Sequence, residues 1–296
     1  MLEQFTARQI QVPDAEIFLR MGGEGPPLLL LHGYPQTHVI WHRIAPVLAR
    51  SFTLVMPDLR GYGRSKGPAP DPDHRAYSKR AMAGDMIAVM DELGFQRFRL
   101  AGHDRGARVA YRLCLDHPER VERVAVLDVV PTLEVWDEMN WQRALGTYHW
   151  PFLAVPAPLP ERLIGAEPEF FVRHLIQRWA KRAEALDSAA VADYVAQFRN
   201  PAVVAATCED YRAGASIDRE HDLADRQAGR KIACPLLMIW GSDYSASAAP
   251  AAEVWRRWAD RVEDLQLDCG HFIAEEEPQA CADALLSFFR NNLPSP

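Results

Sequence analysis

The chain contains 296 residues, of which 48% are hydrophobic and 25% charged, enough for one large α/β domain with an insertion or for two small domains. Its net charge of −7 argues against nucleic acids and anionic membranes as partners, and no apolar run approaches the roughly 20 residues of a membrane span. The five cysteines are odd in number and form no C-x-x-C pair, which predicts free thiols in a reducing, cytoplasmic compartment rather than disulfides or a metal site.

Strands and helices alternate over the first 131 residues. Alternating polar and apolar residues predict a hairpin formed by 5–12 and 16–20. Continuous apolar runs, typical of strands buried on both faces, cover 27–31, 52–56, 98–101 and 121–130. Helical spacing of apolar residues covers 41–48, 78–93 and 107–115. This order predicts an α/β fold with a mostly parallel sheet and helices on both of its faces.

The pattern changes after residue 131. Residues 132–230 are rich in aromatics, prolines and amphipathic helical stretches, and they contain no convincing buried strand. Strand and helix patterns return at 235–241, 262–267 and 278–291. We expect a core domain made of 1–131 and 231–296, because neither half of the sheet is complete alone. Residues 132–230 would form a helical cap over the carboxyl ends of the strands, where open α/β sheets bind ligands; an independent helical domain is the alternative.

The sequence GHDRG at 102–106 has the spacing of a nucleophile elbow, G-x-nucleophile-x-G, in which a sharp turn raises the central side chain above the sheet. Asp104 occupies the position that usually holds serine. A carboxylate is anionic near neutral pH and can displace a leaving group from saturated carbon, forming an ester that water can open. The segment therefore predicts attack on an alkyl halide or an epoxide. A helix cap is the structural alternative for this aspartate.

A histidine and an acid are expected to act with Asp104. The last predicted strand leads into DCGHF at 268–272, so His271 should lie in a loop at the carboxyl edge of the sheet. Since the nucleophile is already ionised, His271 would deprotonate the water that opens the ester. Asp128 and Asp243 both follow predicted strands and could orient this histidine. We favour Asp128, because a lone carboxylate at the end of an apolar strand has no obvious structural role.

Arg105 and Arg108 follow the nucleophile by one and four positions, so both belong to the first turn of a helix and can face the same site. Two guanidinium groups beside Asp104 can hold a substrate carboxylate through bidentate hydrogen bonds, and they also keep Asp104 ionised. The alternative is structural pairing with an acidic side chain, for which the candidates are Asp58, Asp85 and Asp128.

Backbone N–H groups near Asp104 are candidates for an oxyanion hole. HGYP at 32–35 follows the strand at 27–31, and the loop at this place supplies half of the oxyanion hole in elbow enzymes. Because the oxyanion would form on Asp104 itself during ester hydrolysis, we expect the N–H groups of Tyr34 and Arg105 to stabilise it. A tight glycine turn is compatible with this role.

Taken together, these motifs resemble the haloacid dehalogenases of the α/β-hydrolase fold that act on haloacetates, the fluoroacetate dehalogenases. The family's motifs appear as HGYPQ at 32–36, DLRGYG at 58–63, GHDRGAR at 102–108, LDVVPT at 127–132 and CGHF at 269–272. The resemblance extends over nearly the whole chain, with Cys269 in place of a glycine. It implies an α/β-hydrolase fold with a helical cap, a small anionic haloacetate as substrate, no cofactor and a homodimer.

The resemblance also implies that three residues of 132–230 bind the halide, namely His149, Trp150 and Tyr211. Their imidazole, indole and phenol groups are all hydrogen-bond donors. Aromatic packing within the cap is the alternative for His149 and Trp150. Trp179 is a further candidate for the wall of the pocket.

Two other functions compete with dehalogenation. An epoxide hydrolase would share the aspartate nucleophile, but it needs two acidic donors in the cap, usually tyrosines. Tyr211 could be one of them, with Tyr148 or Tyr194 as the second. The two arginines favour a haloacid instead. A ligand-binding protein built on an inactive hydrolase is disfavoured, because Asp104, Asp128 and His271 are all present.

Overall fold

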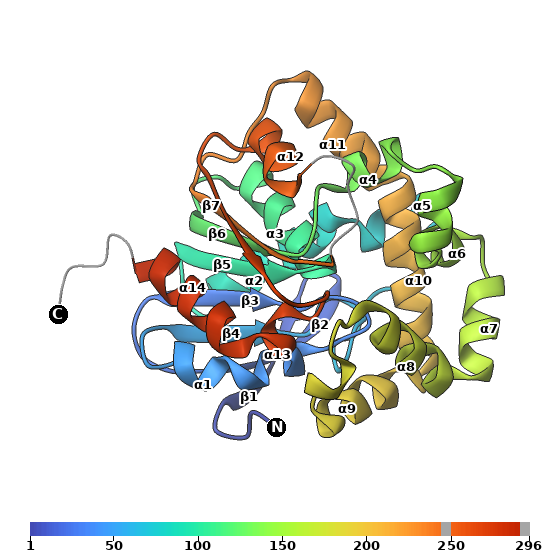
Figure 1. The fold of residues 1–296 in the computed structure, drawn as a ribbon, viewed down its shortest axis with the longest axis horizontal. Helices are drawn as coiled ribbons and strands as arrows, with labels where there is room; N and C mark the ends of the chain where they lie inside the picture. The colour runs from blue at the N-terminus through green and yellow to red at the C-terminus, as the bar shows by residue number, and fades with distance from the viewer. Residues whose placement is uncertain (244–249, 291–296) are drawn as a thin grey trace.

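The computed structural model describes residues 1–243 and 250–290 and contains a twisted eight-stranded sheet (Figure 1). Its strands span Thr6–Val12 (β1), Ala15–Gly22 (β2), Pro27–Leu31 (β3), Thr53–Pro57 (β4), Phe98–His103 (β5), Val121–Leu127 (β6), Leu236–Gly241 (β7) and Val262–Leu267 (β8). The strand order is β1-β2-β4-β3-β5-β6-β7-β8. β2 is antiparallel to both β1 and β4, and the other pairings are parallel. The predicted α/β fold with a mostly parallel sheet is confirmed.

The central strands are apolar throughout because both of their faces are covered. Successive side chains of β3 point to opposite faces, so Leu29 and Leu31 join one hydrophobic cluster while Leu28 and Leu30 join the other. Each of these four leucines is completely buried. β3 pairs in register with β5 from Leu28 to Leu31, which places the end of β3 beside the residues that precede Asp104.

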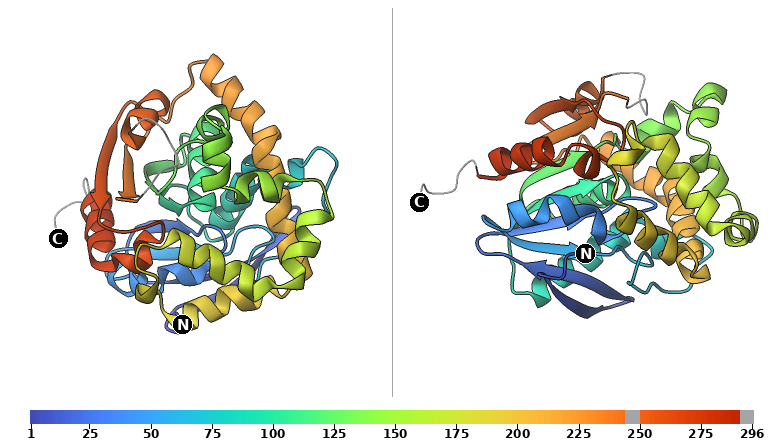
Figure 2. Two further views of the ribbon diagram at one scale, coloured as in Figure 1. Left: turned by 45° about the vertical axis from the view of Figure 1, so that its right-hand side comes forward. Right: turned by 60° about the horizontal axis from the view of Figure 1, so that its bottom comes forward.

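Two layers of helices cover the sheet (Figures 1 and 2). The first layer packs on the cluster that contains Leu29 and consists of Lys79–Glu92 (α2), Arg105–Asp116 (α3) and Ala251–Trp258 (α12). The second packs on the cluster that contains Leu28 and consists of His38–Arg43 (η1, a 3₁₀ helix), Ala45–Leu48 (α1), Ile273–Glu276 (α13) and Pro278–Arg290 (α14). A further 3₁₀ turn, η2, spans Arg75–Tyr77.

Between β6 and β7 the chain forms helices and loops, and we call this segment, residues 132–230, the cap (Figures 1 and 2). Its helices are Thr132–Asp137 (α4), Trp141–Gly146 (α5), His149–Ala154 (α6), Leu159–Ala166 (α7), Pro168–Trp179 (α8), Ala183–Ala185 (η3), Ser188–Phe198 (α9), Pro201–Ala215 (α10) and Ile217–Gln227 (α11). α10 packs against α6, α7, α9 and α11 and so forms the centre of the cap. None of the described helices is both long and apolar enough to cross a membrane.

Most predicted elements agree with the observed ones to within two residues at each end, and two differ further. The helix predicted at 41–48 is divided into η1 and α1; Pro46 lies in the first turn of α1, where its lack of an N–H to donate to a preceding turn is tolerated. The strand predicted at 121–130 ends at Leu127, because the next residue, Asp128, has a positive φ of 58° that ends the extended backbone. The closing helix is described to Arg290, and residue 291 lies outside the described residues.

Helix α3 approaches the end of β3 very closely, and a glycine makes this possible. A Cβ added to Gly106 would lie 2.4 Å from the carbonyl oxygens of Leu31 and His32. Since backbone atoms cannot move aside as flexible side chains can, we predict that Gly106→Ala lowers the free energy of unfolding by about 1–3 kcal/mol. Urea denaturation measures this change.

Gly84, in the exposed middle of α2, is the control, because an added Cβ would meet no atom within 4 Å. Gly84→Ala should raise the free energy of unfolding by about 0.5–1 kcal/mol, the usual gain when alanine replaces glycine inside a helix. Equal stabilities for the two variants would show that the contact between α3 and β3 is not tight.

Candidate active site

Asp104 lies on a strained turn between β5 and α3. Its backbone has φ 45° and ψ −114°, a conformation that is costly for a residue with a side chain. Gly102 permits the turn, since a Cβ there would lie 2.5 Å from the oxygen of Gly106. Gly33 is equally constrained, because its Cβ would lie 2.6 Å from the Cβ of Asp104. The strained backbone of Asp104 and the close approach of these glycines are typical of a nucleophile elbow, here with aspartate at its centre.

The carboxylate of Asp104 is nearly buried but is stabilised as an anion. Burial alone would raise its pKa, but electrostatic interactions with His271, His103, Arg108 and Arg105 outweigh burial and lower the pKa to about 2. The N–H of Tyr34 donates to Oδ2 of Asp104 at 3.0 Å. Asp104 is therefore an ionised carboxylate with one oxygen already bound by a backbone donor.

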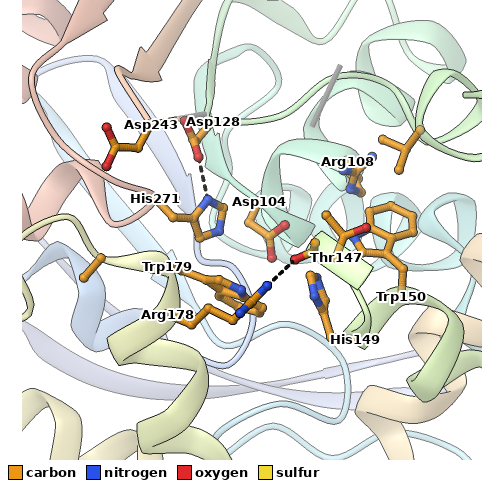
Figure 3. Close-up of a pocket in the computed structure, with 13 residues that line it drawn as sticks. Asp104, Arg108, Asp128, Thr147, His149, Trp150, Arg178, Trp179, Asp243 and His271 are labelled. Carbon is orange, nitrogen blue, oxygen red and sulfur yellow. Dashed lines mark hydrogen bonds and ion pairs between the residues drawn. The ribbon is translucent and has the colours of Figure 1, made fainter. Parts of the chain in front are cut away.

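His271 and Asp128 form a short hydrogen bond, with Nδ1 of the histidine 2.6 Å from Oδ2 of the acid (Figure 3). The other oxygen, Oδ1, accepts the N–H of Gly241 at 2.9 Å, so both oxygens of this buried carboxylate are paired. Burial lowers the pKa of His271, but the hydrogen bond and charge of Asp128, together with Asp104, raise it above the ordinary value. Nε2 is left to face the cavity.

Asp243, the other acid considered for this role, lies at the edge of the cavity and is exposed. Its carboxylate is 3.4 Å from Nζ of Lys181 in the cap. The histidine is instead bonded to Asp128, whose positive φ directs its side chain back across the end of β7.

His103 is a site residue that the sequence motifs did not identify. Its Nε2 lies 2.8 Å from the carbonyl oxygen of His271, and the two rings are 4.5 Å apart. Burial, followed by the charge of His271, lowers the pKa of His103 to about 3, so the ring is neutral and Nε2–H is the donor. His103 therefore fixes the backbone at His271. The general pattern G-x-nucleophile-x-G leaves this position open, and the family motif GHDRGAR includes the histidine without indicating its role.

A cavity of about 460 Å³ lies in front of Asp104, between the carboxyl ends of the strands and the cap (Figure 3). Its lining is Asp104, Arg108, Asp128, Val135, Gly146, Thr147, His149, Trp150, Arg178, Trp179, Ala180, Asp243 and His271. Loops at the ends of β5, β6, β7 and β8 supply the acids and His271, whereas α5, α6 and α8 of the cap supply most of the opposite wall. The structure thus brings the predicted nucleophile, histidine and acid together with predicted cap residues.

Arg108 lines this cavity. Its Nη1 donates to the carbonyl oxygen of Val130 at 2.8 Å, and its guanidinium lies 4.6 Å from the ring centre of Trp150. The Nε atom is buried and has no partner within the described chain. Arg108 is therefore positioned by the core but keeps a donor available.

Arg105 differs from the expectation, because its side chain lies outside the cavity lining and is paired. Its Nε and Nη2 donate to the two carboxylate oxygens of Asp210 at 2.8 and 2.7 Å. This acid, in α10 of the cap, was not among the structural partners considered. The remaining nitrogen, Nη1, is buried and unpartnered within 1–243 and 250–290. Binding of a substrate carboxylate by Arg105 thus stays a prediction and can involve only this atom without breaking the ion pair.

Asp210 also forms polar contacts with two other buried side chains. Asp210 pairs with Lys79 of α2 and accepts the hydroxyl of Tyr62 at 2.6 Å. Burial would raise the pKa of Asp210, but Arg105 and Lys79 outweigh it and hold the pKa well below its usual range. Removing one partner from such a cluster leaves an uncompensated buried charge, so the cluster fixes α10 of the cap onto the core.

The three predicted halide donors lie together but do not have equal access to the cavity. His149 and Trp150 line it, and Nδ1 of His149 has no partner in the described part of the protein. Tyr211 lies outside the lining; its ring centre is 5.9 Å from that of His149 and 5.7 Å from that of Trp150. Their roles in halide binding stay predictions.

Two further cap residues shape the cavity. The ring centre of Trp179, already a candidate for the pocket wall, is 4.5 Å from that of His149 and 5.6 Å from that of His271. Arg178, which the sequence did not single out, reaches across to the carbonyl oxygens of Leu145 and Gly146 at 3.4 and 3.3 Å (Figure 3). Surface arginines are common in helices, so only the folded structure shows that this one lines the cavity.

The chain belongs to the α/β-hydrolase fold family, whose model matches residues 26–278. It is 43% identical to a fluoroacetate dehalogenase from Burkholderia sp, over 97% of this chain and 95% of that protein. A soluble epoxide hydrolase from Corynebacterium sp. (strain C12) is 31% identical over 98% and 99%. The crystal structure of ALR0039 from Nostoc sp PCC 7120 has a TM-score of 0.95 and 48% identity, covering 98% of this chain and 99% of that one. The predicted fold class and family resemblance are confirmed.

The hydrogen bond between His271 and Asp128 leads to a prediction about titration. In Asp128→Asn the anion that raises the pKa of His271 is absent while burial still lowers it, so the pKa should fall relative to the parent. NMR titration of the His271 ring measures this change. Asp243→Asn, which removes an acid at the cavity edge, should leave the pKa near its parent value. A larger fall in Asp243→Asn than in Asp128→Asn would assign the orienting acid to Asp243.

Proposed function

We propose that this protein is a hydrolase that cleaves the carbon–halogen bond of haloacetates, converting a haloacetate and water into glycolate, halide and a proton. The observation that carries the proposal is the ionised Asp104 carboxylate on the elbow, in a cavity that also contains Arg108. An anionic nucleophile needs no base for attack on saturated carbon, and the arginine suits a substrate that is itself an anion. Similarity to a fluoroacetate dehalogenase supports the same substrate class.

In the first step Oδ1 of Asp104 attacks the carbon that bears the halogen, and the bonding pair leaves with the halide. Oδ2, which already accepts the Tyr34 N–H, becomes the carbonyl oxygen of the new ester. Arg108 holds the substrate carboxylate. We propose Nη1 of Arg105 as the second donor, since this atom has no partner among the described residues, although its side chain lies outside the cavity lining. These contacts place the reacting carbon beside the nucleophile, which is the main contribution that positioning makes to rate.

Three donors then stabilise the departing halide: the ring N–H groups of His149 and Trp150 and the hydroxyl of Tyr211. A hydrogen bond to a charged group is worth about 1.5–3 kcal/mol, so three supply about 4–9 kcal/mol. If they act mainly in the transition state, the rate rises by about 10³ to 10⁶. Burial lowers the pKa of His149 to about 3; the charge of Asp104 opposes this shift, while His271 and the two arginines add to it. The ring therefore acts as a neutral donor.

In the second step His271 removes a proton from water, which attacks the carboxyl carbon of the Asp104 ester. Negative charge develops on Oδ2 and is stabilised by the N–H of Tyr34 and by that of Arg105. Asp128 orients the imidazole and stabilises its protonated form. Collapse of the tetrahedral intermediate breaks the bond to the glycolate oxygen, which takes up the remaining proton of the attacking water. Asp104 is thereby restored as a carboxylate, and His271 releases its proton to solvent.

An epoxide hydrolase of the same fold is the second candidate, since such a protein is also similar over nearly the whole chain. Its chemistry needs two acidic donors over the opening ring. Tyr194 is turned away, because its hydroxyl donates to Glu275 at 3.1 Å. Tyr148 and Tyr211 both lie outside the described cavity lining, so no tyrosine pair lines it. Arg108 and His149 occupy the cavity instead. These placements favour the haloacid over the epoxide.

We further propose that the protein is a cytoplasmic homodimer. Its five cysteines are free and buried, which suits a reducing compartment. Large apolar side chains are exposed on three cap helices: Trp141 and Leu145 on α5, Leu159 and Leu163 on α7, and Phe170 on α8. Exposed apolar residues at this density favour a partner surface. Sedimentation of the purified protein tests the dimer.

Substrate charge provides the sharpest test of the function. Haloacetate should be a far better substrate than haloacetamide, because losing charge-assisted bonds to the carboxylate costs about ten- to a hundredfold per bond. Arg108→Leu should raise KM for haloacetate. Halide release from fluoroacetate, chloroacetate, chloroacetamide and an uncharged chloroalkane, alongside diol formation from an epoxide, measures these preferences. Equal kcat/KM for chloroacetate and chloroacetamide, or faster epoxide opening, would favour the epoxide hydrolase.

Removing His271 should allow ester formation to be observed without ester hydrolysis. His271→Ala should still form the ester but hydrolyse it very slowly, so one equivalent of halide is released and the peptide that contains Asp104 gains mass. Mass spectrometry of the variant mixed with chloroacetate detects this adduct. Asp104→Ala should give neither adduct nor turnover. Turnover by Asp104→Ala would contradict the mechanism.

A further inference from the structure

The loop that carries His271 lies directly against the backbone of the cap at 179–182. A Cβ added to Gly270 would lie 2.3 Å from the nitrogen of Lys181 and 2.5 Å from the oxygen of Trp179. The N–H of His271 itself donates to that oxygen of Trp179 at 2.9 Å. The proposed base and a wall of the cavity are therefore joined backbone to backbone, through a glycine that permits the approach.

Glu276, at the end of α13, binds both segments at once. Its Oε2 accepts the N–H groups of Lys181 and Arg182 in the cap at 2.9 and 3.0 Å. The same oxygen accepts the N–H of Gly270 at 3.1 Å, and Oε1 accepts that of Phe272 at 3.1 Å. The side chain is 5% exposed and lies outside the cavity lining. Four backbone N–H groups, two from the cap and two from the His271 loop, thus donate to one buried carboxylate.

These hydrogen bonds stabilise the buried Glu276 carboxylate and also position the backbone around His271. The accepted N–H groups belong to the residues on either side of His271, so the carboxylate fixes the backbone from which the imidazole projects. On the cap side they follow Trp179, whose ring lies 5.6 Å from that of His271 (Figure 3). A change at Glu276 would therefore move the histidine and the cavity wall relative to each other.

We propose that Glu276 is a positioning residue that fixes the His271 loop to cap segment 179–182, so that the base is aligned only while the cap is seated. The inference rests on the proposed function, because it assigns Glu276 to the second step of that reaction. Ester formation uses Asp104, Arg108 and the halide donors, none of which Glu276 contacts. Ester hydrolysis needs His271 within reach of the attacking water, so Glu276 matters there.

Glu276→Gln tests this assignment. A glutamine offers one oxygen and one NH₂ group, so at least one of the four backbone donors faces another donor and the loop must shift. We expect ester hydrolysis to slow by about tenfold or more, the factor for one lost charge-assisted hydrogen bond, with ester formation within about twofold of the parent. Rapid-quench assays of chloride release from chloroacetate should show a burst, and mass spectrometry should show the Asp104 ester in the steady state.

Two neighbouring acids provide matched controls. Glu277→Gln removes a charge from the same helix end and an ion pair with Arg182, but none of the backbone bonds to the His271 loop. Glu275→Gln alters a bond between core and cap, through Tyr194, again without touching that loop. Neither control should produce a burst. A burst of equal size in a control, or equal slowing of both steps in Glu276→Gln, would overturn the inference in favour of general loosening of the cap.

The outcomes also separate this inference from the proposed function. If the parent releases no halide from haloacetates, the proposed function fails, and the His271 ring signals of Glu276→Gln and Glu277→Gln then decide whether Glu276 positions the histidine. If the parent turns over and Glu276→Gln shows no burst, only the inference fails. Should Glu276→Gln not fold, Glu276→Asp, which keeps two acceptor oxygens on a shorter side chain, must show a burst that the parent and Glu277→Gln lack for the inference to stand.

Discussion

The structure depends on keeping one buried carboxylate, that of Asp104, ionised on a strained turn. A buried anion is costly unless charges and donors compensate for it. Here the compensation comes from several elements at once: Tyr34 from the loop after β3, Arg108 from α3 and His271 from the loop after β8. Each group is in turn fixed by a neighbour, as Asp128 fixes His271. The catalytic geometry is therefore a consequence of neutralising one charge.

The cap is bound to the core by ionic and backbone contacts as well as by apolar packing. Asp210 bridges Arg105 and Lys79 on one side of the cavity, and Glu276 holds Lys181 and Arg182 on the other. Both carboxylates are buried, so neither contact is weakened by solvent as a surface ion pair would be. Each anchor also binds residues next to proposed catalytic groups: Asp210 binds Arg105 beside Asp104, and Glu276 binds Gly270 and Phe272 on either side of His271.

Short-range patterns explain what could be predicted from the sequence. Apolar runs located the buried strands, and the glycine spacing around Asp104 located the elbow, because both depend on neighbours in the chain. An isolated acid at the end of an apolar strand pointed to Asp128, which is bonded to His271. The partner of Arg105 could not be predicted, since Asp210 is 105 positions away and one of many acids. His103 and Glu276 act through backbone atoms of folded loops, which leave no pattern in the side chains.

The insertion of the cap has a consequence for how the molecule is made. β6 ends at Leu127 and its sheet neighbour β7 begins at Leu236, so the edge of the growing sheet stays open while the intervening residues are translated. At about 5–20 residues per second this interval lasts about 5–20 s. During that time Asp128 has neither the Gly241 N–H nor His271 to pair with. The nascent chain thus exposes an unpaired strand edge, the kind of surface to which chaperones respond, until β7 leaves the ribosome.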